Sequence, residues 1–329
     1  MQLPIIIFIL AVFSLKAHAT ELFEVHNNAR AMGMGGAYSA VVENDEALWY
    51  NPASIAKNGG VYWTIADPKV GLGDVSALEN FSSLGDSTTF ASTLDKLYGK
   101  PIWLGASAKS SVIMPFFAAA YYYDVDVSVI ADNPVSPTLT TNYITDNGYA
   151  IGSGWSIGGI LQMGFALKYI TRTGIRTEWG PQTIADIISG SSTPDIIFDS
   201  FSEATGKGYA LDLGLNLTIP TFVQPTISLV GKNIGNTKFV AANGAIAPPT
   251  EPQNILVGAS LLVSLPLVHI VPSLEVRHLL DTDIQLGKKI HMGIELGLPL
   301  ISARAGLYQG YFTYGAGFNF GILQIDAAS

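Results

Sequence analysis

The sequence predicts an all-β protein, an antiparallel transmembrane β-barrel with a small helical hatch at its N-terminus. Two features of the composition point that way. Charged residues make up only 13% of the chain and the mean hydropathy is +0.34, whereas soluble domains average about 25% charged residues. Beyond residue 20, however, no apolar run reaches the roughly 18 residues that a transmembrane helix needs. The apolar residues must therefore be distributed by alternation, as in the strands of a membrane barrel.

Alternation is visible in individual stretches of the sequence. In 161–169, 209–217, 288–298 and 312–320, every second residue is predominantly apolar, and those between are mostly Gly, Ala, Ser and Asn. A soluble β-sandwich would also alternate, but its outer face would be rich in charged residues. Small and neutral residues fit the crowded interior of a barrel better, so we expect the apolar face to contact lipid.

The connections predict the topology. Short turns are expected at Met114-Pro115, Gly158-Gly159, 219–225, Leu265-Pro266, Leu298-Pro299 and Phe320-Gly321, and longer polar loops at 125–147, 171–207, 233–252 and 278–286. This scheme gives about twelve complete strands and a thirteenth that begins at Ile322. The sequence pattern for a strand is weakest at 101–113. Because bacterial single-chain barrels have even strand numbers, we expect about 14 strands and a chain truncated at its C-terminal end.

The first residues are typical of a signal peptide. An apolar run, Leu3 to Leu15, is too short to cross a bilayer and is followed by an A-x-A cleavage pattern at Ala17 to Ala19. We therefore divide the chain into a signal peptide (1–19), an N-terminal hatch (20–60) and a transmembrane β-barrel (61–329). The expected location is the outer membrane of a Gram-negative cell. Because the chain has no cysteine, its stability must come from packing or closure and not from disulfides.

The hatch region lacks the period of two. Asp45 to Trp49 can begin a helical turn, and Asn51-Pro52 ends it, because a residue before proline avoids the helical conformation. The glycines at 33, 35 and 36 lack the preceding strand that a phosphate cradle requires, so tight packing of a plug is the favoured interpretation. For Asn51-Pro52-Ala53, a helix stop and a ligand contact both stay open.

Two motifs in this region resemble a known family. Ala29-Arg30-Ala31-Met32-Gly33-Met34-Gly35-Gly36-Ala37 and the stretch 44–53 ending in Asn51-Pro52-Ala53 are similar to the hatch of the long-chain fatty-acid transporters (FadL-type) and of their PorV-type and TraF-like relatives. The run 233–239 resembles a segment of the PorV/TraF-like branch. The resemblance implies a fourteen-stranded barrel whose hatch or ligand-binding residues are Arg30, Met32, Gly33, Met34, Gly35, Gly36, Asn51, Pro52 and Ala53.

Charged side chains are expected inside the barrel. The predicted lumen-facing polar residues are Lys168, Asp212, Glu275, Arg277, His291 and Glu295. We interpret them as a structural network. No nucleophile motif such as G-x-S-x-G accompanies them, so we expect no enzyme. The five histidines have no metal-ligand spacing, and neither a metal nor a cofactor is predicted. A net charge of −9 argues against a nucleic-acid partner.

Two functions remain open. The first is a channel for hydrophobic small molecules, fatty-acid-like or aromatic, that pass the hatch along an apolar track including Met32, Met34 and Leu48. The alternative is an interaction platform for a secretion or conjugation system, without transport. A platform should expose a large apolar patch on 125–147 or 171–207, where 181–206 can form short amphipathic helices. Outer-membrane lipid, a hydrophobic small molecule and, for the platform, a partner protein are the expected partners.

Overall fold

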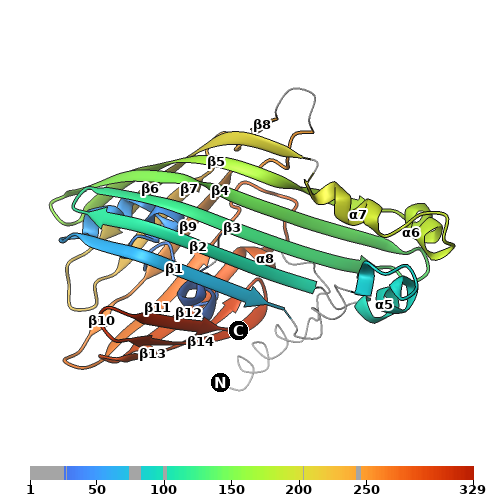
Figure 1. Ribbon diagram of the computed structural model, residues 1–329. Coiled ribbons are helices and arrows are strands. Elements are labelled where there is room, and N and C mark those ends of the chain that lie inside the picture. Colours follow the sequence, from blue (N-terminus) through green and yellow to red (C-terminus); the bar gives the residue numbers. More distant parts are fainter. Residues whose placement is uncertain (1–25, 27, 74–82, 99–101, 203, 242–245) are drawn as a thin grey trace, which may run out of the picture.

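One antiparallel sheet forms the body of the protein, and it curves around the N-terminal segment (Figure 1). The computed structural model describes residues 26, 28–73, 83–98, 102–202, 204–241 and 246–329, so the expected signal peptide lies outside the described residues. The sheet order is β1-β2-β3-β4-β5-β6-β7-β9-β11-β12-β13-β14-β15, with β8 on β6 and β10 on β11. In the described part of the chain no pairing joins β1 to β15, and the sheet is not closed.

The strands of the sheet are β1 (Tyr62–Leu72), β2 (Ile102–Met114), β3 (Phe117–Asp132), β4 (Thr138–Ile157), β5 (Leu161–Trp179), β6 (Thr205–Thr218), β7 (Thr226–Lys232), β8 (Phe239–Ala241), β9 (Asn254–Ser260), β10 (Val263–Ser264), β11 (His269–Val276), β12 (Ile290–Gly297), β13 (Ile301–Tyr308), β14 (Tyr311–Asn319) and β15 (Gln324–Ala328). The helices are α2 (Ala29–Gly33), α3 (Ala47–Tyr50), η1 (Pro52–Lys57), α5 (Phe90–Leu97), α6 (Pro181–Ile188), α7 (Asp195–Asp199), η2 (Ser200–Ser202) and α8 (Leu286–Lys289). Among the described residues, none of these helices is long and apolar enough to span a membrane.

The predicted all-β class is confirmed, and the alternation has the predicted sense. On β6, the apolar side chains point outward, with Tyr209 77% exposed, whereas Asp212 between them is 1% exposed. All six predicted short turns lie between paired strands. The strand predicted at 101–113 is present as β2, and the thirteenth strand of the main path is β15.

The predicted long loop at 125–147 is wrong. Strands β3 and β4 run through it, and they leave only residues 133–137 as a connection. Likewise β5 continues to Trp179, which shortens the loop predicted at 171–207. The polar residues that suggested loops, including Asp126, Asp146 and Arg172, are buried on the inner face of the sheet. A polar residue on a barrel strand points inward, so polarity alone does not mark a loop here.

Three helices cover the end of the long strands β3 to β5 (Figure 1). The buried side chains of α5, α6 and α7 form one apolar cluster with strand residues: Leu84, Phe90, Leu94, Leu97, Ile102, Val129, Ala131, Leu139, Ile184, Ile187, Ile197 and Phe201. Helices α6 and α7 are the amphipathic pieces expected within 181–206. Their apolar faces are turned toward the strands, with only Ile188 and Ile196 exposed among their large apolar residues.

Candidate functional site

The N-terminal segment, residues 28–60, lies inside the curved sheet and contacts opposite parts of its wall (Figure 1). Helix α2 contacts β13, β14 and β15, whereas η1 contacts β4, β5 and β6. Asn51 is fully extended, with φ −163° and ψ 102°, between α3 and η1. This conformation is the one that a residue before proline favours, so the Asn-Pro pair divides the segment into two helical pieces.

A row of glycines receives η1. Gly154, Gly164 and Gly214 are directly paired across β4, β5 and β6. A Cβ atom built on Gly164 would lie 2.8 Å from the backbone nitrogen of Ala53, and one on Gly154 would lie 3.0 Å from the carbonyl oxygen of Pro52. The three glycines therefore allow the backbone of Pro52 and Ala53 to lie directly on the sheet. We call this contact the glycine seat.

Neutral hydrogen bonds complete the glycine seat. The Asn51 amide donates to the carbonyl oxygen of Ser39 at 3.0 Å and to Oδ1 of Asn216 at 2.7 Å. Its own Oδ1 accepts from the backbone of Ala53 at 3.1 Å. Asn216 in turn donates to the hydroxyl of Ser54 at 3.0 Å. Every polar atom of the Asn51 side chain is thus paired, although the residue is completely buried.

The glycine-rich turn after α2 lies on the opposite wall. Gly35 and Gly36 have φ values of +62° and +78°, which favour glycine. A Cβ on Gly35 would also collide with the backbones of Met292 and Leu307. The structure therefore supports tight packing as the role of these glycines.

Polar and charged side chains of β11, of Arg277 directly after it and of β12 hold this turn and the residues that follow it. Glu275 accepts from the backbone nitrogens of Tyr38 and Ser39 at 3.1 and 2.8 Å, and its other oxygen pairs with Arg277 at 2.6 Å. Arg277 also donates to the carbonyl oxygen of Gly36. His291 Nδ1 lies 2.9 Å from the carbonyl oxygen of Gly35, which requires the ring to donate there. We call this contact, from β11 to β13, the ionic seat.

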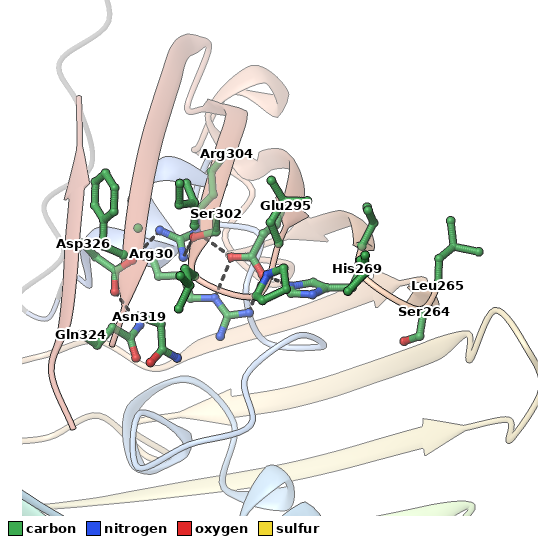
Figure 2. A pocket seen from close by; sticks show the side chains of 18 of the residues that line it. Arg30, Ser264, Leu265, His269, Glu295, Ser302, Arg304, Asn319, Gln324 and Asp326 are labelled. Atoms are coloured by element: carbon green, nitrogen blue, oxygen red, sulfur yellow. Dashed lines mark hydrogen bonds and ion pairs between the residues drawn. The ribbon is translucent and has the colours of Figure 1, made fainter. Parts of the chain in front are cut away.

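Arg30 extends the ionic seat toward the short-turn end of the sheet (Figure 2). Its guanidinium binds Glu295 through two hydrogen bonds of 2.8 and 2.6 Å. Arg304 donates to the same carboxylate at 2.5 Å and to Asp326 at 2.6 Å. These residues line a cavity of about 480 Å³. Since each arginine already faces a carboxylate, this cavity has no excess positive charge with which to bind an anion.

A second group of charges joins the segment to β1 and β2. Lys109 Nζ lies 2.8 Å from Asp45 and 2.6 Å from Glu46, and Lys69 lies 2.8 Å from Glu46. Burial alone would raise the pKa of Glu46, but the two ammonium groups outweigh it and hold the pKa well below 4.5. Lys109 was missed in the sequence because the strand that carries it was the least certain, although it lies on the inward face of the alternation.

Of the predicted lumen-facing residues, Glu275, Arg277, His291 and Glu295 contact the N-terminal segment. Lys168 and Asp212 instead pair with each other at 2.5 Å, and Asp212 also accepts from the backbone of Asn233 at 2.8 Å. In the part of the chain that the structure describes, no three His, Cys, Asp or Glu side chains are grouped so that they could hold a metal ion.

Cavities lie on both sides of the segment. One of about 570 Å³ is lined by Ala40, Val41 and Lys57 of the segment and by polar wall residues such as Gln162 and Thr226. Another, of about 480 Å³, lies between Met32 and the edges of β1 and β15. Met34 and Leu48 are completely buried, so the apolar track expected past them is filled by the segment in this conformation.

Comparison with known proteins gives a likeness of fold. Neither a family model nor a curated protein matches the sequence. The structure is similar to the "TodX monoaromatic hydrocarbon channel deltaS2 mutant", with a TM-score of 0.50 and 11% identity over 93% of this chain and 92% of that chain. It also aligns with the "CymD monoaromatic hydrocarbon channel" (TM-score 0.47, 10% identity, 93% of each chain) and with a Pseudomonas aeruginosa FadL homologue (TM-score 0.39, 10% identity, 92% of each chain).

The expected FadL-type barrel is thereby confirmed as a likeness of fold over 93% of this chain. The closer relation to the PorV/TraF-like branch stays a prediction.

Proposed function

We propose that this protein is an outer-membrane channel for hydrophobic small molecules, and that residues 28–60 are the hatch that closes it. The observation that carries the proposal is the placement of this segment inside the curved sheet, with a cavity on either side. The likeness to TodX, a channel for monoaromatic hydrocarbons by its title, supports the same class of cargo. The exposed apolar faces of the strands, as on β6, support a location in a bilayer.

In this proposal the segment closes the lumen, so passage requires the segment to move. Both seats hold it by many small contacts, and a partial release of one seat would open a path while the other keeps the segment attached. The expected signal peptide at 1–19 would bring the chain to the outer membrane. No chemical step is required of any residue.

Uptake of labelled toluene tests the proposal. The full chain would be produced in the outer membrane of a Gram-negative host without its own hydrocarbon channels. We expect a faster initial uptake than in cells without the protein. A matched pair of variants sharpens the test. Asn51→Ala removes the contacts to Ser39 and Asn216, whereas Asn58→Ala, in the same segment, removes a local hydrogen bond to Gly60.

Loosening the hatch by Asn51→Ala should also admit small polar solutes, which the wild type and Asn58→Ala should exclude. Toluene uptake no faster than in cells without the protein, together with a stoichiometric partner protein in the detergent-purified sample, would contradict the channel and favour the interaction platform. The apolar faces of α6 and α7 turn toward the strands, so these two helices leave little apolar surface for such a partner.

A further inference from the structure

One aromatic side chain is displayed in the cavity between the segment and the edges of β1 and β15. Trp103 lies on the inward face of β2, is half-buried, and lines this cavity together with Met32, Leu72 and Ala327. The other four tryptophans, at 49, 63, 155 and 179, line none of the cavities described above. The cavity volume of about 480 Å³ is within the range of small-molecule sites.

Two glycines allow the indole ring to lie flat against the sheet. Gly71 and Gly105 are directly paired across β1 and β2. A Cβ on Gly105 would lie 2.8 Å from Cζ2 of Trp103, and one on Gly71 would collide with the end of the ring. The glycines therefore cover one side of the ring, and any larger residue at either position would lift it from the wall.

The ring is also fixed in its plane. The indole nitrogen donates to both carboxylate oxygens of Asp126, at 3.0 and 3.2 Å. Asp126 is itself the neighbour of Gly105 in the register of β2 and β3, so the acceptor, the glycines and the ring belong to one patch of the wall. A tryptophan with its polar atom satisfied and one side covered presents a rigid apolar surface on its other side.

We infer that this cavity binds a neutral one- or two-ring aromatic hydrocarbon, stacked on Trp103. The inference rests on the proposed channel function and names the substrate class at this point of the path. Met32 adds a polarizable thioether, which contacts aromatic rings favourably. Three carboxylates, of Asp124, Asp126 and Asp326, line the cavity against a single ammonium group, that of Lys69. The excess of negative charge disfavours an aromatic acid.

Naphthalene, its saturated counterpart decalin and 1-naphthoate are the probes. Their binding to the full chain in detergent would be measured by equilibrium dialysis, with protein-free micelles as the baseline. We expect naphthalene to bind more tightly than decalin or naphthoate. Trp103→Leu should weaken naphthalene binding roughly three- to tenfold, the factor that corresponds to the loss of one aromatic stacking contact, and leave decalin unchanged.

Three further variants keep the test specific. Trp103→Phe retains a ring and should stay within about threefold of the wild type. Gly105→Val keeps the indole but lifts it from the wall, and should weaken naphthalene binding as much as Trp103→Leu does. Trp155→Leu removes an outward-facing indole that is 44% exposed, and should change nothing. Equal naphthalene affinities of the wild type and Trp103→Leu, or decalin binding as tight as that of naphthalene, would overturn the inference.

Failure of the inference and failure of the channel have different signatures. If the wild type takes up toluene but its affinity for naphthalene does not depend on Trp103, the aromatic site alone is overturned. A wild type that neither binds naphthalene or decalin nor accelerates toluene uptake overturns the channel as well. Tighter binding of the cationic analogue 1-naphthylmethylamine than of naphthalene would overturn the assignment of a neutral ligand.

Discussion

The glycine seat and the ionic seat hold the same short segment by different chemistry. On β4 to β6, backbone lies on backbone across three paired glycines, and the polar contacts are neutral. On β11 to β13, carboxylates and guanidinium groups bind backbone atoms and Arg30. The first contact depends on shape and is insensitive to pH. The second contains buried charges, each of which depends on its partner.

This difference indicates which contact can be released. Displacing Pro52 and Ala53 leaves an empty surface of glycines, and it breaks packing contacts and neutral hydrogen bonds such as that from Asn51 to Asn216. Displacing the turn at Gly35 and Gly36 leaves Glu275 without the backbone donors of Tyr38 and Ser39. Unpaired buried charges are costly, so we expect the segment to move first at the glycine seat and to stay attached at the ionic seat.

The largest effect is expected from Glu275→Gln. The substitution leaves Arg277 buried without its carboxylate, and breaking such a pair costs about 3–5 kcal/mol. This loss would be measured as a decrease in the free energy of unfolding in detergent. The double variant Glu275→Gln/Arg277→Met should recover part of the loss, because it removes the uncompensated charge. Glu178→Gln, at an exposed glutamate of β5, is the matched control; an equal loss there would contradict a special role of the ionic seat.

Gly164→Leu should disturb the glycine seat without touching a charge. Its Cβ would meet the carbonyl of Pro52 and the nitrogen of Ala53, and backbone atoms cannot move aside cheaply. Overpacking of this kind costs about 1–3 kcal/mol. Bilayer conductance is the sharper readout, since a lifted segment should let ions pass. Gly180→Ala, where nothing lies within 4 Å, should leave both quantities unchanged. If Gly164→Leu conducted no ions and unfolded with the same free energy as the wild type, η1 would not lie on this row of glycines.

Acid should weaken the charged contacts of the segment and spare the neutral ones. The folded-state pKa of Glu46 is held well below the ordinary 4.5. Its contribution to stability is therefore fully present above pH 4.5 and is lost as the pH falls through the folded-state pKa. The melting temperature of the wild type should decrease more between about pH 5 and pH 3 than that of Glu46→Gln. Parallel curves for the two proteins would contradict the contribution of Glu46.

The smallest effect is expected from Ser228→Ala. The Ser228 hydroxyl forms a 2.8 Å hydrogen bond with that of Ser39, and both residues are buried. Losing it should cost about 1 kcal/mol, with the same value at pH 5 and pH 7 because neither group ionises. The loss would be measured by thermal unfolding at both pH values. A loss of stability that changes with pH would mean that this hydrogen bond is coupled to the nearby ionic seat.

Much of the wall could be predicted from the sequence, because the rule that forms it is local. Side chains on a strand alternate between lipid and lumen, so the period of two predicted the outward face of β6 and the inward positions of Asp212 and Glu295. The proline- and glycine-containing turns marked the strand ends. The same rule explains the one systematic error: Asp126, Asp146 and Arg172 suggested loops because their polarity was not assigned to the inner face of longer strands.

The contacts of the N-terminal segment could not be predicted in this way. Arg30 and Glu295 are 265 positions apart, and Lys109 is 63 positions from Glu46. Which inward residue faces which part of the segment depends on the register of every strand between them, and a shift of one residue would turn the side chain outward.

The sequence by itself therefore determined an antiparallel sheet with an apolar outer face, the sites of its short turns and a non-β segment at its N-terminus. Only the tertiary structure decided that glycines from three strands form one seat, that Glu275 and Arg277 bind the backbone of the segment, and that Trp103 faces a cavity. The physical reason is that strand formation follows from alternation within one stretch of chain, whereas a binding surface in a barrel is assembled across strands that meet only when the sheet curves.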